Sequence, residues 1–261
     1  MVAGIVVAAV TGVASGGLES GFHWAVGAVS EDPTALAITS DVVDPQSGCE
    51  EGGGHVFPET VERLSGFRDY LEGGKNDDRA YLARHRATPA NYRIIRLSLQ
   101  SRTTTAIIID AVHIKVKKKL PVTPGTHIWT VGQCGDGSVR NMSFDLDRSP
   151  TSYRIAKLPN YSDRRQLGRL PATVTPGNPE TMNIIPYTYT SGYQFTVSVH
   201  YIEAGKRKTW EVRDNGKPFA IMSSRGSRAY VQYSGEDDYT AEGKSVGGPP
   251  QWVLPAAKDG P

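Results

Sequence analysis

Residues 195–221 read FTVSVHYIEAGKRKTWEVRDNGKPFAI, and this stretch decides the fold class. Its apolar side chains alternate with polar ones, and a period of two predicts strands that bury one face. Ala204-Gly205 separates the first two predicted strands, and Asn215-Gly216 precedes the third. Asn-Gly is the strongest short hairpin signal, because both residues tolerate the positive φ of a type I′ turn. The stretch therefore predicts an antiparallel β-meander.

The chain upstream shows the same period of two. Apolar and polar residues alternate from Tyr92, and a β-branched run covers Thr104–Val116. Clusters of Pro, Gly, Asn and Asp supply turns between further predicted strands, which cover residues 34–43, 125–133, 139–145, 153–158, 182–189 and 229–233. We therefore predict a mainly β fold, an Ig-like antiparallel β-sandwich.

A small helical insertion is predicted at about residues 59–86. Within residues 59–71, apolar side chains recur every three or four positions and Gly73 follows, the pattern of an amphipathic helix with a glycine stop. A second short helix is predicted over residues 77–86. We expect the insertion to cover one end of a sheet.

The composition fits one globular domain with appendages. The 261 residues include 38% hydrophobic and 21% charged residues, with 28 Gly and 17 Pro, which is typical of a turn-rich globular protein. We predict an N-terminal apolar segment and acidic linker over residues 1–33, a β-sandwich domain over 34–233, and a disordered Gly/Pro-rich tail over 234–261.

The charge is distributed unevenly along the chain. The formal net charge is +2, but the first Lys or Arg is Arg63, whereas acidic residues begin at Glu19. Lys and Arg are retained on the cytoplasmic side of a membrane segment, so an exported flank lacks them. An acidic loop region without basic residues by chance is the alternative. The pattern favours a domain outside the cytoplasm.

Residues 1–18 carry no charge, although their glycines, alanines and hydroxyl residues make them only weakly apolar. This length is near the shortest that spans a bilayer. A signal peptide is one alternative, but the positively charged start that it needs is missing, and a buried soluble segment is another. We predict a single-pass membrane anchor with the C-terminal domain extracytoplasmic, or a secreted protein if the segment is cleaved.

Cys49 and Cys134 are the only cysteines. In an exported protein an even count predicts a disulfide, because an oxidising compartment lets the bond persist. Closure of so long a loop would stabilise the fold by about 4 to 5 kcal/mol. Two buried free thiols are the alternative. No metal site is predicted, since neither cysteine lies in a Cys-x-x-Cys pair or at zinc-ligand spacing from a histidine.

Short motifs are spread over residues 34–222. They are Cys49 with Gly53-Gly54-His55-Val56-Phe57-Pro58, Leu97-Ser98-Leu99-Gln100, Cys134-Gly135, Phe144-Asp145-Leu146-Asp147 and Asn215-Gly216-Lys217-Pro218-Phe219. Together they resemble a group of actinobacterial membrane-anchored extracytoplasmic β-sandwich proteins with no known activity. The resemblance implies the topology, a bond between Cys49 and Cys134, and a β-sandwich. It implies no catalytic residue.

A ridge of positive charge is predicted on the strand that contains Val112, Ile114 and Val116. These apolar residues take one face, so the intervening side chains take the other. We call the resulting set the basic ridge, which is formed by His113, Lys115, Lys117, Lys118 and Lys119. In an exported protein it would hold anionic lipid headgroups or cell-wall polymers rather than nucleic acid. Protection of an exposed strand against aggregation is the alternative role of such lysines.

Asp145 and Asp147 alternate with apolar residues, which would aim both carboxylates to one side of a strand. A close pair of carboxylates is what calcium binding or glycoside hydrolysis requires. Polar, solvated residues at the end of a strand before Pro150 are the alternative interpretation.

Other polar and aromatic residues give weaker signals. The histidines are scattered singly, so their spacing predicts no metal or catalytic role for His55, His113, His127 or His200. An aromatic concentration could stack on sugars or a peptide, although strand propensity and core packing also account for Tyr187, Tyr189, Tyr193 and Tyr201. The nucleophile-elbow and phosphate-loop motifs are absent.

These observations favour a non-catalytic extracytoplasmic interaction module anchored to the membrane. Its expected partner is another envelope protein or an anionic envelope polymer. One alternative is a hydrolase of envelope glycans or peptides that uses Asp145 and Asp147, and another is a structural subunit of an envelope complex. We predict no cofactor and no metal.

Overall fold

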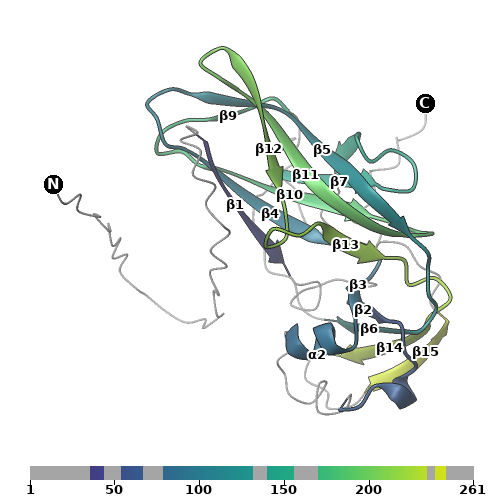
Figure 1. Cartoon of the computed structure of the whole chain (residues 1–261). Coiled ribbons are helices and arrows are strands. Elements are labelled where there is room, and N and C mark those ends of the chain that lie inside the picture. The colour runs from purple at the N-terminus through teal and green to yellow at the C-terminus, as the bar shows by residue number, and fades with distance from the viewer. Residues whose placement is uncertain are drawn as a thin grey trace, which may run out of the picture.

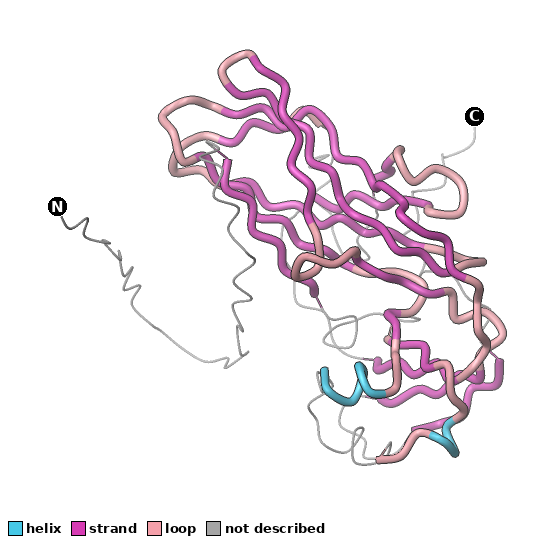
Figure 2. Tube along the Cα trace, viewed as in Figure 1, coloured by secondary structure: helices cyan, strands magenta, loops and turns pink. Residues whose placement is uncertain are grey.

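The computed structural model describes residues 36–43, 54–66, 79–131, 140–155, 170–233 and 239–244. Strands make up 60% and helices 6% of these residues, so the prediction of a mainly β chain is confirmed. Two sheets pack face to face, and a third sheet lies at one end of them, in the lower part of Figure 1 and Figure 2.

The first sheet has the strand order β1-β4-β10-β7-β8. Its strands are β1 (Leu36–Val43), β4 (Ile94–Ser101), β10 (Glu180–Tyr187), β7 (Arg140–Asp145) and β8 (Tyr153–Ile155). Neighbours are antiparallel except β10 and β7, which run parallel with Tyr187 beside Asp145. This pair corrects the prediction of purely antiparallel pairing, because the chain crosses through other elements between the two strands. As a result, the carboxyl ends of β7 and β10 lie side by side at the same end of the sheet.

The second sheet has the order β12-β11-β5-β9, with β13 also pairing with β11. Its strands are β12 (Lys206–Val212), β11 (Gly192–Glu203), β5 (Ile107–Leu120), β9 (Ala172–Val174) and β13 (Phe219–Met222). All of these pairings are antiparallel. The predicted hairpin of β11 and β12 is confirmed, but the third strand of the predicted meander does not return along β12. Instead, β13 pairs with the other half of β11 and runs in line with β12, so the meander prediction is wrong at this point.

The two predicted turns, at Ala204-Gly205 and Asn215-Gly216, have the geometry that their residues predict. Ala204 and Asn215 have φ values of 47° and 48°, and Gly205 and Gly216 have 76° and 81°. Both central residues of each turn therefore have positive φ, as a type I′ turn requires.

One hydrophobic core lies between the first two sheets. Leu97 and Phe144 enter it from the first sheet, and Phe195 and Phe219 enter it from the second, all fully buried. The rings of Phe195 and Phe219 stack with their centroids 5.7 Å apart. The inward positions of the alternating strands thus meet between the sheets.

The third sheet, which we call the end sheet, has the order β15-β14-β6-β2-β3. Its strands are β15 (Tyr239–Lys244), β14 (Arg228–Tyr233), β6 (Thr126–Val131), β2 (His55–Phe57) and β3 (Thr88–Pro89). β14 and β6 run parallel, which is a second exception to antiparallel pairing. The prediction of a disordered tail is wrong for β15, because its backbone pairs with β14 although its sequence has no apolar period.

The predicted helix over residues 59–71 is wrong in its described part. Only a 3-10 turn, η1 (Val61–Arg63), forms there, and Gly66 has a φ of +71°, outside helical geometry. The second predicted helix is confirmed as α2 (Arg79–Arg84). Leu64, a buried member of the apolar repeat within the described residues, packs on the end sheet in a separate core with Phe57, Tyr81 and Ile128.

A hydrogen-bonded junction connects the sandwich to the end sheet. Its centre is Asn91, which is buried and has a φ of 60°. The Oδ1 of Asn91 accepts bonds of 2.9 Å from both the N–H and the hydroxyl of Ser224. The Asn91 N–H donates to the carbonyl of Met222, and its carbonyl accepts from the N–H of Thr188, both at 2.8 Å. One side chain and its backbone therefore hold three chain segments together.

The predicted membrane segment at residues 1–18 and the predicted disulfide between Cys49 and Cys134 lie outside the described residues. Within the described ranges, no helix has the length and apolarity to cross a bilayer.

Candidate functional site

A pocket of about 410 Å³ opens where β7 and β10 end side by side. The parallel register of these strands places Asp145 and Tyr187 at its rim, and β8 contributes Arg154. We call it the tyrosine pocket, and its lining residues are Asp145, Asp147, Arg148, Arg154, Tyr187, Tyr189 and Thr190.

Asp145 turns the chain at the end of β7. Its Oδ1 accepts hydrogen bonds from the backbone N–H groups of Asp147 at 3.0 Å and Arg148 at 3.2 Å. A carboxylate that binds the backbone two and three residues later is an Asx turn. Burial, together with the charge and the hydrogen bond of Asp145, raises the pKa of the Tyr187 hydroxyl to about 12. Asp145 therefore faces a hydroxyl that stays protonated at neutral pH.

Asp147 holds the turn between β10 and β11. Its Oδ2 accepts hydrogen bonds from the N–H groups of Tyr189 at 2.6 Å and Thr190 at 3.2 Å. Its Oδ1 accepts from the hydroxyls of Thr190 at 2.8 Å, Tyr193 at 3.0 Å and Thr188 at 3.1 Å. Burial raises the pKa of Asp147, but these hydrogen bonds, led by that from Tyr189, outweigh burial and lower it overall. The carboxylate is therefore ionised and fully bonded.

The pocket contains both predicted carboxylates, and their hydrogen bonds bear on the hydrolase alternative. A general acid must hold a proton near neutral pH, and a nucleophile must present a free lone pair. Asp147 does neither, because its pKa is lowered and both oxygens accept hydrogen bonds. Asp145 uses one oxygen for its own turn. The pair shapes the pocket, and Asp147 is more than a solvated residue at the end of a strand, because it accepts hydrogen bonds from the turn between β10 and β11.

The remaining wall of the pocket is aromatic and cationic. The Tyr187 and Tyr189 rings meet edge to face, with centroids 5.9 Å apart and planes at 89°. Tyr187 is buried and Tyr189 is half-buried, so the second ring forms the accessible wall. Arg148 and Arg154 are exposed, and neither forms an ion pair with another described residue. Two guanidinium groups are thus available beside an aromatic ring.

Comparisons with known proteins give no relative from which a role for the pocket could be inferred. No protein-family model matches the chain, and no curated protein matches its sequence.

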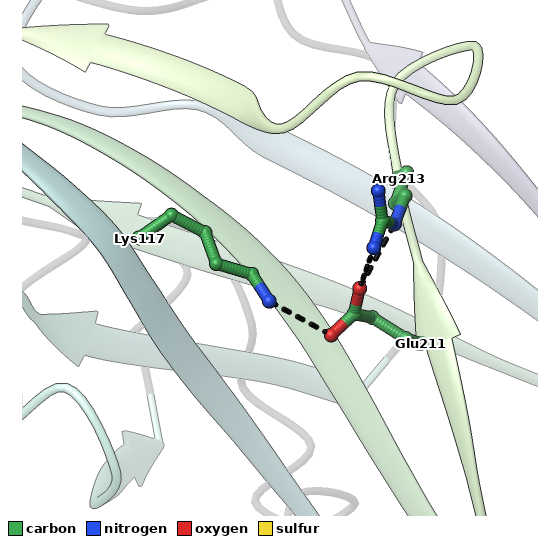
Figure 3. Close-up of polar contacts among 3 residues, drawn as sticks. All are labelled: Lys117, Glu211 and Arg213. Carbon is green, nitrogen blue, oxygen red and sulfur yellow. Dashed lines mark hydrogen bonds and ion pairs between the residues drawn. The ribbon is translucent and has the colours of Figure 1, made fainter.

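The structure divides the basic ridge. Lys115, Lys117, Lys118 and Lys119 are all exposed on β5. Figure 3 shows Lys117 reaching Glu211 on β12, at a distance of 3.1 Å between Nζ and Oε2. The other oxygen of Glu211 accepts a hydrogen bond of 2.8 Å from Nε of Arg213. Lys117 is therefore neutralised locally, whereas Lys115 and Lys118 have no ion-pair partner among the described residues.

His113, the remaining member of the ridge, has a neighbour that the spacing did not predict. Its ring lies 4.8 Å from that of His200, centroid to centroid. In the register of β5 and β11, Ser198 lies opposite His113 and Ala111 opposite His200, so the two histidines are diagonal neighbours. The only sequence signal was that both occupy polar positions of alternating strands, because the register between distant strands cannot be read from spacing.

The other candidate residues lie in the interior. Tyr201 and Tyr193 are buried in the sandwich, so core packing accounts for them better than ligand stacking does. His55 and His127 are buried in the end sheet. Burial first, then the charges of Arg93 and His127, lower the pKa of His55 to about 3. Within the described ranges, no group of three or more His, Cys, Asp or Glu side chains could hold a metal ion.

Proposed function

We propose that the chain is a non-catalytic extracytoplasmic interaction module that binds an anionic envelope polymer in the tyrosine pocket. The observation that carries this proposal is that two arginines without an ion-pair partner among the described residues lie beside an accessible tyrosine in one pocket. Arg148 and Arg154 line it beside Tyr189. Asp147, the residue that a hydrolase would need, is already saturated by hydrogen bonds.

The chemistry of the pocket fits a sugar that carries a carboxylate. A guanidinium binds a carboxylate through two parallel hydrogen bonds, and Arg148 and Arg154 supply two such groups. The Tyr189 ring offers an apolar face with a polar tip, which suits a ring that is apolar on one side and hydroxylated at its edge. Asp145 accepts hydrogen bonds and would take a hydroxyl of the same sugar.

Three features of the chain bear on where it acts and how its sheets are classified. We propose that residues 1–18 anchor the chain, that Cys49 and Cys134 form a disulfide, and that the two packed sheets are Ig-like. The lack of basic residues before Arg63 supports export. Alkylation of thiols with and without reductant tests the disulfide, because a bonded pair gains the alkyl mass only after reduction.

Isothermal titration calorimetry with trigalacturonate, a uniformly carboxylated trisaccharide, tests the pocket. We expect binding of trigalacturonate and not of neutral maltotriose. The double substitution Arg148→Gln and Arg154→Gln should weaken binding at least about tenfold, because each charged hydrogen-bonding contact contributes on the order of 1.5 to 3 kcal/mol. The matched control is Arg102→Gln with Arg225→Gln, two exposed arginines outside the pocket that carry the same change in charge. Equal binding by the two double variants would contradict the proposal.

The hydrolase alternative is tested on the same samples. Trigalacturonate incubated with the protein should be recovered intact by chromatography, since Asp147 cannot act as an acid or a nucleophile. If the wild-type protein produces shorter saccharides and the Asp145→Asn variant does not, the result would support the hydrolase instead. No specific contact favours the alternative of a structural envelope subunit.

A further inference from the structure

The outer face of the second sheet carries a second polar cluster, and none of its residues lines the tyrosine pocket. In the cross-strand register, one row runs from Glu211 through Ser198 to His113. A second row, two residues away along each strand, runs from Thr209 through His200 to Ala111. Rows two residues apart share a face of the sheet, so this register brings the two histidines together.

Hydrogen bonding and backbone irregularity position the two rings. Nδ1 of His200 lies 3.1 Å from the hydroxyl oxygen of Thr209, which leaves its Nε2 for another partner. The register of β5 and β11 shifts between His200 and Tyr201, where Asp110 is the extra residue on β5. Such a bulge re-aims side chains at the point where it occurs. The ring centroids of His113 and His200 are 4.8 Å apart as a result of this arrangement.

The acidic groups around the histidines are already engaged. Asp110 pairs with Arg207 on β12 at 3.5 Å. Glu211 on β12 accepts bonds from Lys117 on β5 and from Arg213. Lys115 and Lys118 are further exposed basic side chains on this face, and neither has an ion-pair partner in the part of the chain that the structure describes. Lys115 lies two residues beyond His113. The face therefore has an unbalanced positive charge, and its histidines are the groups that can increase it.

We propose that His113, His200 and Lys115 form a second binding site, the histidine face, which takes phosphate groups of an anionic polymer and binds them more tightly at mildly acidic pH. Protonation of both rings places two positive charges side by side, and their repulsion opposes protonation in the free protein. A phosphate that bridges the rings removes that repulsion. Binding of the anion and uptake of protons therefore favour one another.

The electrostatics of the free site agree with this linkage. Burial and the neighbouring His200 lower the pKa of His113, while the charge of Asp110 acts in the opposite direction. The His113 ring is therefore mainly neutral at pH 7 without a ligand. The histidine face gains its full charge only when the pH falls or an anion arrives.

Fluorescence anisotropy with labelled linear polyphosphate tests the proposal at pH 7.5 and pH 5.5. The internal phosphates keep their charge over this range, so any change comes from the protein. We expect the wild-type chain to bind about tenfold more tightly at pH 5.5, an effect of two added charges. The double substitution His113→Gln and His200→Gln should bind as wild type at pH 7.5 and lose most of the gain at pH 5.5.

Controls separate the histidine face from general attraction and from the tyrosine pocket. Lys115→Gln should weaken binding severalfold at both pH values, whereas Lys217→Gln, the same change at an exposed turn, should not. The Arg148→Gln and Arg154→Gln variant should keep the full pH dependence. Vesicles of phosphatidylglycerol and of phosphatidylcholine distinguish lipid phosphates from a soluble polymer as the source. A histidine double variant that keeps the pH dependence, or a Lys115→Gln variant equal to Lys217→Gln, would overturn the proposal.

A measurement on the wild-type protein does not depend on any variant folding. Nuclear magnetic resonance titration of the imidazole protons of His113 and His200 reports their pKa values directly. Saturating polyphosphate should raise the value for His113, because the bound anion favours the charged ring. Unchanged values with the polymer bound would contradict the linkage.

Discussion

The Oδ2 atom of Asp147 lies 2.6 Å from the backbone nitrogen of Tyr189, 42 residues further along the chain. This hydrogen bond connects the turn after β7 to the turn between β10 and β11. Tyr189 is also the accessible aromatic wall of the tyrosine pocket. The Asp147 carboxylate therefore fixes the ring that would contact a ligand, which is how a binding site gains a preformed shape.

Asp147→Ala should destabilise the protein and weaken the pocket together. The substitution leaves the N–H of Tyr189 and the hydroxyl of Tyr193 without their acceptor. We expect a loss of about 2 to 4 kcal/mol in the free energy of unfolding, measured with urea, since several charge-assisted hydrogen bonds disappear. Asp41→Ala, at an exposed position of β1, is the control and should change stability little. Equal unfolding midpoints for the two variants would show that Asp147 does not hold the turn.

Asn91 allows the side-chain and backbone contributions at the junction to be separated. Asn91→Gly keeps the positive φ without strain but removes the acceptor of two bonds from Ser224. We expect it to lower the free energy of unfolding by about 1 to 3 kcal/mol. Asn91→Ala loses the same acceptor and must also adopt a left-handed conformation, which costs about 1 to 2 kcal/mol more. If urea denaturation shows the Asn91→Ala variant to be more stable than the Asn91→Gly variant, the backbone at this position relaxes and the positive φ is not required.

The turns could be predicted from the sequence because their cause is local. Asn215-Gly216 forms its tight turn, closed by the bridge of Asp214 and Lys217, through the φ preferences of two residues. The tyrosine pocket has no such local cause. Asp145 and Tyr187 become neighbours only through the parallel register of β7 and β10. That register depends on the strand order and connections of the whole sheet.

The errors in the secondary-structure prediction have the same origin. Leu64 lies in an apolar repeat of three and four residues that predicts a helix, but the end sheet buries its side chain from an irregular segment. β15 lacks any strand pattern and forms because β14 offers an unpaired edge. In both cases a tertiary partner outweighs the local preference of the sequence.

The lowered pKa of buried His55 should make the folded protein less stable in mild acid. Its pKa is about 3 in the folded protein and near 6.5 in the unfolded chain, so the unfolded state binds the proton more readily. The stabilisation is therefore complete above pH 6.5 and is lost as the pH falls towards 3, at about 1.4 kcal/mol per pH unit. Urea unfolding at pH 7.0 and pH 5.0 should differ by about 2 kcal/mol from this residue alone.

His55→Gln removes this titration and should reduce the difference between the two pH values. Because a buried substitution also changes packing, the comparison uses the pH dependence of each variant rather than its absolute stability. In the wild-type protein, the His55 resonances should show no protonation down to pH 5. Protonation of His55 in the folded state above pH 5 would contradict the burial argument.

Glu211→Gln should increase polyanion binding without unfolding the protein. The substitution releases Lys117 and Arg213 from their shared carboxylate and leaves both positive charges unbalanced on the face that carries His113. Ion pairs at this degree of exposure contribute about 1 kcal/mol or less, so the free energy of unfolding should change by no more than that. Binding of polyphosphate at pH 7.5 should become severalfold tighter, and the gain should fade as salt screens the charges. Glu62→Gln makes the same change in net charge on an exposed residue outside this face and should leave binding unaltered. If both variants gain affinity equally, the polymer responds to net charge and not to the histidine face.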